Sequence, residues 1–163
     1  MVVILKQELI KRLEYGNKKE TEFMCSLNET INDANISITK TIDKFCCVDY
    51  KVKNEVNKKC IYLELKSRKD DISKFNTLLI GKDKLNKISN YYNKFYVLLI
   101  WYDECKNMYI TIYNDDLLKS PTNNLFTNSF DIDKSCCKKS DMKNLSDGIK
   151  KLLSAFKKSE PKT

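Results

Sequence analysis

Glu64 and Lys66 carry opposite charges two positions apart within residues 61–68, whose sequence is IYLELKSR. Apolar and polar residues alternate along this segment. The alternation predicts a strand with one apolar face for a core and an opposite face that carries Tyr62, Glu64 and Lys66. A carboxylate beside an ammonium group on a rigid strand suits a divalent-cation site next to a phosphate. The alternative is a solvated strand face, since strands with charged outer faces are common.

Asp49 is an acidic residue that a simple strand pairing brings to the same place. It is the only acid in residues 45–52, an apolar run that alternates and predicts a second strand. Residues 53–59 form a charged loop of the length that joins antiparallel neighbours. If the two strands form a hairpin, Asp49 lies near Glu64 and Lys66 on one face of the sheet.

Glu20 is the third acidic candidate, and it belongs to a helix predicted over residues 18–31. The apolar stripe of this helix consists of Phe23, Met24, Leu27 and Ile31. Glu20 falls on that stripe, and a glutamate at the buried edge of a helix needs a partner or a metal. The alternative is a solvated residue in the first turn of the helix, where the helix dipole favours an acid.

The composition excludes several kinds of catalytic site. The chain has no histidine, which excludes Ser–His and Cys–His arrangements. Its seven cysteines include the adjacent pairs Cys46-Cys47 and Cys136-Cys137 but no Cys-x-x-Cys motif. This spacing argues against a zinc site and favours reduced, mostly buried thiols. An enzyme built from this sequence would therefore use carboxylates, lysines and a metal.

Length and charge suggest the kind of partner. The chain has 163 residues, which suits one domain plus a tail, and its formal net charge is +8. A basic balance favours polyanions, either nucleic acid or an anionic membrane. The apolar run at residues 1–5 is too short for a signal peptide or a membrane span, and the longest run, at 95–102, is the size of a strand. We therefore expect a soluble, intracellular protein without a membrane partner.

The order of the predicted elements indicates an α/β (α+β) fold with a mixed central β-sheet flanked by helices. The almost uninterrupted apolar run at 94–102 predicts a central strand that is covered on both faces. The remaining predictions are a helix at 3–15, a stop or kink at Gly16-Asn17, strands at 36–41, 77–80 and 108–113, a helix at 83–92 and a loop at 114–133 with a break at Ser120-Pro121.

The carboxyl-terminal part differs in composition from the rest. From Lys134 onward there are nine lysines against three acidic residues, together with an amphipathic helical stripe. We therefore divide the chain into a domain at 1–130, with its core at 16–115, and a basic segment at 131–163 that contains a helix. This helix could dock on the domain as a last helix, hold nucleic acid as a basic arm, or lie on a membrane surface or a protein partner.

Taken in order, these motifs resemble the PD-(D/E)xK nuclease superfamily, which has the restriction-endonuclease-like fold. Gly16-x-x-x-Glu20 followed by Phe23 is similar to the opening helix of archaeal Holliday-junction resolvases. Cys47-Val48-Asp49-Tyr50 stands where the superfamily has its Pro-Asp or plain Asp. Residues 62–68, with Leu79-Ile80-Gly81-Lys82 after them, are similar to small nuclease-like proteins of large DNA viruses. Two departures are the lack of a proline before Asp49 and lysines in place of a glutamine that some members carry in the helix after Gly81.

The resemblance implies a role for each of these residues. Asp49, Glu64, Glu20 and the backbone carbonyl of Leu65 would bind Mg²⁺ or Mn²⁺. Lys66 would position or help deprotonate the attacking water, or neutralise the phosphate. The side chains expected to contact flanking phosphates are Arg68, Lys82, Lys84 and Lys87. Tyr91, Tyr92 and Tyr102 are expected in the core in preference to stacking on bases. Small members of the superfamily often dimerise, so a homodimer is implied as well.

Three hypotheses follow for function. The first is a Mg²⁺-dependent endo- or exodeoxyribonuclease that cleaves DNA, located in a host cytoplasm or nucleus, or in a virion, if the protein is viral. The second is a catalytically inactive nuclease-fold module that binds nucleic acid or a protein. The third is a structural protein in which Glu64 and Lys66 only form a strand face. Convergence of Asp49, Glu64 and Lys66 on one place would separate the first two from the third.

Overall fold

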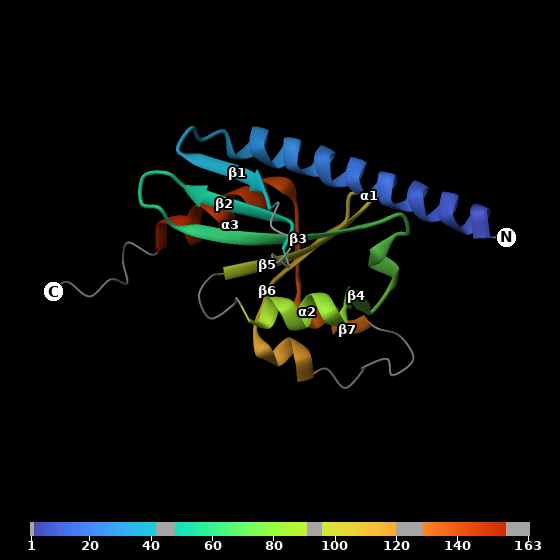
Figure 1. Cartoon of the computed structure of the whole chain (residues 1–163). Helices are drawn as coiled ribbons and strands as arrows, with labels where there is room; N and C mark the ends of the chain where they lie inside the picture. Colours follow the sequence, from blue (N-terminus) through green and yellow to red (C-terminus); the bar gives the residue numbers. More distant parts are fainter. Residues whose placement is uncertain (1, 42–47, 91–95, 120–128, 156–163) are drawn as a thin grey trace.

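A computed structural model of the chain describes residues 2–41, 48–90, 96–119 and 129–155 (Figure 1). In chain order its helices and strands are α1 (Val2–Ile31), β1 (Ile36–Lys40), β2 (Tyr50–Asn54), β3 (Cys60–Arg68), β4 (Thr77–Gly81), α2 (Lys82–Ser89), β5 (Tyr96–Asp103), β6 (Met108–Ile112), β7 (Ser129–Asp133), β8 (Lys138–Ser140) and α3 (Met142–Ala155). Short 3₁₀ helices lie at Ile72–Lys74, Asp115–Lys119 and Lys134–Cys136.

In the described part of the chain, six strands form the central sheet, in the order β1-β2-β3-β5-β6-β8. The pair β3–β5 is parallel, and the other neighbours in this sheet are antiparallel. A second, antiparallel sheet consists of β4 and β7. Residues 97–101 of β5 are buried without interruption, as their apolar run predicted. This mixed sheet with flanking helices confirms the predicted α+β fold class.

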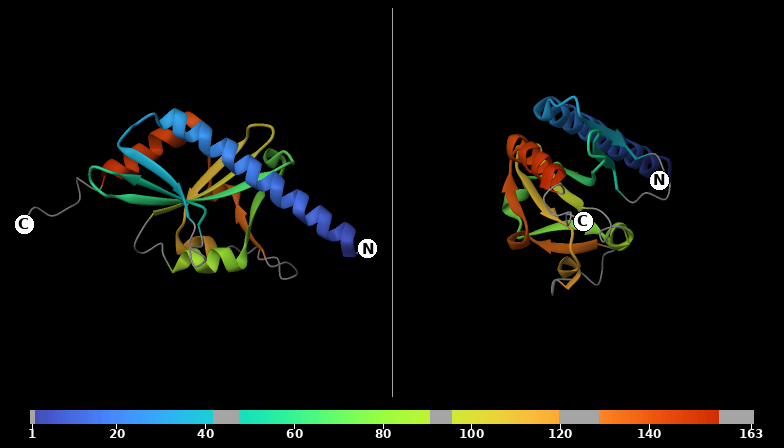
Figure 2. Two further views of the ribbon diagram at one scale, coloured as in Figure 1. Left: turned by 45° about the horizontal axis from the view of Figure 1, so that its top comes forward. Right: turned by 90° about the vertical axis from the view of Figure 1, so that its left-hand side faces the viewer.

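Each face of the central sheet carries its own hydrophobic core. Figure 2 shows α1 and α3 on one face, with α2 and the β4–β7 pair on the other. The α1/α3 core contains Leu27, Ile61, Leu63, Ile100 and Ile149 among others. The α2 core contains Leu85, Ile88, Leu99, Trp101 and Ile132 among others. β3 therefore separates two cores, and its alternating side chains face them in turn.

The first helix is continuous, so the predicted break at Gly16-Asn17 is wrong. Gly16 does not adopt a positive φ, and a glycine inside a helix costs only about 1 kcal/mol relative to alanine. The helix ends at Ile31, where Asn32 takes a left-handed φ of 42°. Its amino-terminal half extends beyond the sheet (Figure 1). No helix in the described part of the chain is both long and apolar enough to cross a membrane.

The predicted hairpin forms, but its first strand begins later than expected. β2 and β3 are antiparallel with Tyr50 opposite Leu63. The predicted strand at 45–52 placed Val48 and Tyr50 on one face, whereas Val48 lies in the α2 core and Tyr50 in the α1/α3 core. A bend at Val48 and Asp49 reverses the alternation, and residues 45–47 lie outside the described part.

The region after β6 holds more structure than the loop predicted at 114–133. A 3₁₀ helix and β7 lie within this range, and β8 adds an edge strand that was not predicted. These segments are short, so periodicity gives little signal for them. The predicted break at Ser120-Pro121 lies outside the described residues.

The amphipathic helix near the carboxyl end packs on the sheet. Leu145, Ile149 and Leu153 of α3 are buried in the same core as Leu27 of α1. This packing agrees with docking as a last helix. The α1/α3 core thus contains residues from both sides of the predicted boundary at 130, and the division into two parts stays a prediction.

The two halves of α1 allow a matched test of the packing. Leu27 is 0% exposed and Leu9 is 57% exposed. We expect Leu27→Ala to lower the free energy of unfolding by about 2–5 kcal/mol, because it leaves a cavity in a packed core. Leu9→Ala, the same change on the same helix, should cost less than about 1 kcal/mol. Urea denaturation measures both, and equal losses would contradict this assignment of buried and exposed halves.

Candidate active site

Asp49 occupies the point where β3 runs past the start of β2. The last backbone pairing near this point is the hydrogen bond from Asp49 N–H to the Leu63 carbonyl, at 3.0 Å. Further along β3, the N–H of Leu65 donates instead to Asp49 Oδ2, at 2.9 Å. The carboxylate thus takes the place of a strand partner, and this bond fixes the orientation of the side chain. The other oxygen, Oδ1, remains for contacts within the site.

Glu64 is the most buried acidic residue of the site. Its side chain points to the α2 face of the sheet and is 0% exposed. Lys66 Nζ lies 3.1 Å from Glu64 Oε1, and Lys84 Nζ lies 3.3 Å from Glu64 Oε2. Among the described residues, neither oxygen has a hydrogen-bond partner of ordinary geometry. Two ammonium groups therefore flank this buried carboxyl group and compensate its charge when it ionises, and its burial rules out a solvated strand face at Glu64.

Lys84 connects the two carboxylates. Besides its contact with Glu64, its ammonium group lies 3.9 Å from Asp49 Oδ1. Leu85 and Ile88 pack the inner face of α2 into its core, and this packing holds the first turn of the helix against the site. Sequence reasoning included Lys84 among the phosphate contacts and missed its place between the carboxylates. The contact depends on how α2 docks, which sequence periodicity does not specify.

The electrostatics of the site reflect buried negative charge. Burial, and to a smaller extent the charge of Asp49, raise the pKa of Glu64, while Lys66 and Lys84 oppose the shift; the net pKa is about 8. Burial also raises the pKa of Glu20, and the charge of Asp49 again adds to the effect. The carboxylates therefore destabilise one another, and additional positive charge would stabilise the group.

Glu20 lies on α1, across the sheet from α2. Its side chain is half-buried next to Phe23 and Met24, as the stripe predicted. The alternative of a first-turn residue is wrong, because α1 begins at Val2. Glu20 and Asp49 interact through their charges. Within the described ranges, however, no three His, Cys, Asp or Glu side chains gather closely enough to hold a metal ion.

The other predicted phosphate contacts are Arg68, Lys82 and Lys87. The guanidinium group of Arg68 donates to the carbonyls of Ser67 and Leu79, both at 3.1 Å, and so ties β3 to β4. Lys82 is half-buried and Lys87 is exposed, both on α2. Their contacts with phosphate stay predictions.

Of the three tyrosines considered for base stacking, Tyr102 lies in the described part. It packs against the α1/α3 core, with its ring centroid 4.5 Å from that of Phe23. This agrees with core packing. Tyr91 and Tyr92 lie outside the described residues.

The donor set suits a hard divalent cation. Asp49 and Glu64 offer oxygen atoms only, which Mg²⁺ and Mn²⁺ prefer. Mg²⁺ usually takes one or two carboxylates together with substrate phosphates and several waters, so a two-carboxylate site is sufficient. The buried oxygens of Glu64 have no hydrogen-bond partner among the described residues, and a divalent cation would supply them with a partner. The part of the Leu65 carbonyl and of Glu20 as further ligands stays a prediction.

Comparison with known proteins shows similarity at the level of structure but none at the level of sequence. No protein-family model matches the sequence, and no curated protein matches it either. A solved structure of Hjc, a Holliday junction resolvase from the hyperthermophilic archaeon Archaeoglobus fulgidus, aligns with a TM-score of 0.47 and 14% sequence identity. The alignment covers 74% of this chain and 96% of that chain. At this level the similarity does not establish a family for the chain.

The raised pKa of Glu64 predicts how stability depends on pH. Between its ordinary value of 4.5 and about 8, the folded state holds a proton that the unfolded state has lost. The folded protein should therefore lose stability as the pH rises through this window. Glu64→Gln removes this pH dependence, so the free energy of unfolding of the variant relative to that of wild type should increase by about 3–5 kcal/mol between about pH 5 and pH 9.

Chemical denaturation in EDTA at several pH values measures this difference. Glu29→Gln is the matched control, because Glu29 is an exposed glutamate on α1. Its stability should follow wild type across the same range. If the free energies of unfolding of wild type and Glu64→Gln change with pH in the same way, the electrostatic description of the site is wrong.

Proposed function

We propose that this protein is a metal-dependent nuclease that hydrolyses phosphodiester bonds in DNA. The observation that carries the proposal is the cluster at the open end of the β2–β3 hairpin, where Lys84 contacts both Asp49 and Glu64, and Lys66 pairs with Glu64. Two carboxylates and an ammonium group, held on rigid strands, are the groups that metal-assisted attack on a phosphate needs.

The residues would divide the work as follows. A bound Mg²⁺ or Mn²⁺ supplies Lewis-acid stabilisation of the phosphoryl oxygen and of the attacking water. Asp49 would bind the cation through Oδ1, because Oδ2 is held by the N–H of Leu65. Glu64 would bind it from the buried side, where the low exposure excludes competing water. Lys66, one pleat further along β3, would orient the attacking water or neutralise the phosphate.

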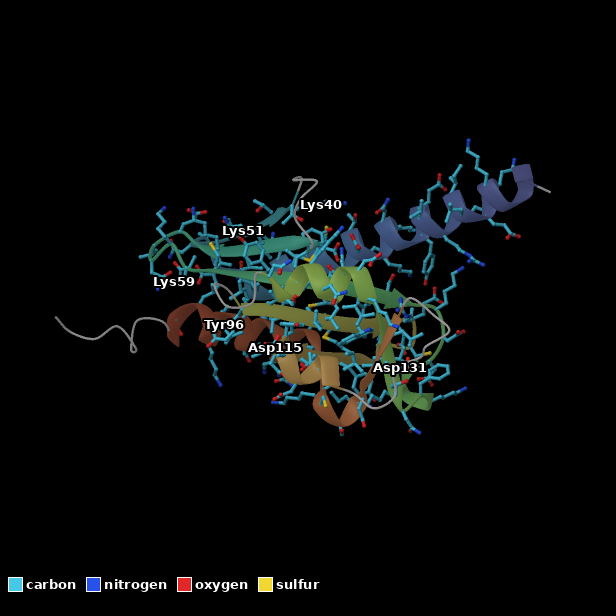
Figure 3. The ribbon with its side chains drawn as sticks, turned by 60° about the horizontal axis from the view of Figure 1, so that its bottom comes forward. Lys40, Lys51, Lys59, Tyr96, Asp115 and Asp131 are labelled. Atoms are coloured by element: carbon cyan, nitrogen blue, oxygen red, sulfur yellow. The ribbon has the colours of Figure 1, made fainter. Side chains whose placement is uncertain are left out.

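The charge distribution supports a polyanionic substrate on the hairpin side of the site. Lys51 is directly opposite Tyr62 in the hairpin, so its side chain shares the face that carries Glu64. Figure 3 shows Lys40, Lys51 and Lys59 on the half of the molecule built from β1–β3, with Asp115 and Asp131 on the other side of α2. Lysine contacts with phosphates would position DNA without reading its sequence.

A second candidate is a nuclease-fold module that binds nucleic acid or a protein without cutting. The observation in its favour is that Lys66 and Lys84 already neutralise the carboxylates. A site that carries its own counter-ions can persist without a metal. The first proposal includes Mg²⁺ or Mn²⁺ as cofactor and DNA as substrate. Three further points stay predictions: a homodimer, the endo- or exonucleolytic mode, and a viral or intracellular location.

Cleavage of plasmid, linear and branched DNA with Mg²⁺ or Mn²⁺ tests the first proposal. Asp49→Asn and Lys66→Met should each lower the cleavage rate by about 100-fold or more, because each removes a group that acts on the transition state. Both variants should keep the circular dichroism spectrum of wild type.

Lys74→Met is the matched control for charge. Lys74 is exposed in the 3₁₀ helix Ile72–Lys74, away from the cluster, and its loss should leave the rate unchanged. DNA binding by wild type without any cleavage would favour the second candidate. If both Asp49→Asn and Lys66→Met still cleave DNA at the rate of wild type, the nuclease activity does not come from this site.

A further inference from the structure

We propose that Lys84 is an exchangeable counter-ion of the site. Its ammonium group lies between the carboxylates of Glu64 and Asp49, and it transfers to a DNA phosphate when a divalent cation takes that place. This inference rests on the proposed function and deepens it. It gives Lys84 a role distinct from that of Lys66 and from that of an ordinary surface lysine.

The distances place Lys84 where a shared cation has to bind. Its Nζ is 3.3 Å from Glu64 Oε2 and 3.9 Å from Asp49 Oδ1, so it contacts both carboxylates. Within the described residues, Lys66 pairs with Glu64 Oε1 and has no ion pair with Asp49. A divalent cation that takes one oxygen from each carboxylate must approach the same region, at about 2.0–2.1 Å from each. Two cations so close repel each other, and the ammonium group has to leave.

The side chains differ in how freely they can move. Asp49 is held by the N–H of Leu65, and Glu64 is fully enclosed. The Lys84 side chain is 30% exposed and stands on a flexible four-carbon stem in the first turn of α2. The carboxylates therefore stay in place while the ammonium group swings outward, toward the side from which a phosphate arrives.

Calorimetric titration with Mn²⁺ alone tests the first half of the exchange. At about pH 9, where protons compete least for Glu64, Lys84→Met and Lys84→Gln should bind Mn²⁺ at least about tenfold more tightly than wild type, equivalent to about 1.4 kcal/mol. Lys84→Arg keeps the charge and should stay within about threefold of wild type. Lys74→Met, which also removes one positive charge but from an exposed site, should bind as wild type does.

Binding of a short DNA duplex tests the second half. In EDTA the ammonium group remains on the carboxylates, so wild type and Lys84→Met should bind the duplex with similar affinity. With Ca²⁺ in place of Mg²⁺, wild type should gain at least about threefold more affinity than Lys84→Met, because only wild type releases an ammonium group to a phosphate.

The outcomes separate this inference from the proposed function. If wild type cleaves DNA but the neutral Lys84 variants bind Mn²⁺ no more tightly, the exchange is overturned and the nuclease proposal stands. An equal gain from Ca²⁺ in wild type and Lys84→Met also overturns it. If wild type neither binds Mn²⁺ nor cleaves DNA, both proposals fail.

Discussion

The burial of the Glu64 carboxyl group between two ammonium groups is the constraint on which the rest of the site depends. An ionised carboxylate with no exposure costs several kcal/mol unless cations compensate it. Lys66 comes from the same strand, but Lys84 comes from α2, so the charge is balanced only when that helix is docked. The site and the α2 core therefore stabilise each other. Loss of the docking would leave a carboxylate in an apolar setting with half of its partners.

The second organising feature is the mismatch in length between β2 and β3. Because β3 continues past Leu63, the N–H of Leu65 needs an acceptor that β2 does not provide, and Asp49 supplies it. A structural need of the backbone thus holds a carboxylate beside Glu64. The bend at Val48 and Asp49 belongs to the same arrangement, because it moves the chain from one core to the other.

Local patterns predicted much of the fold. Alternation identified β3, and the charged loop after β2 indicated the hairpin that brings Asp49 to Glu64. The same patterns failed where nonlocal packing competes with local preference. α1 runs through Gly16 because Phe23, Leu27 and other core residues pack its second half, and the weak helix propensity of one glycine is too small to end it. β7 pairs with β4, far away in sequence, so its short run gave no signal.

The sequence by itself determined which residues of β3 enter a core and which face the opposite side, because side chains alternate along any strand. It also determined that chemistry here would depend on carboxylates and lysines, since the chain has no histidine. Only the tertiary structure decided that the opposite side is buried as well, and that Lys84 meets both carboxylates. The reason is that burial and ion pairing depend on contacts between distant segments, and the docking of α2 creates them.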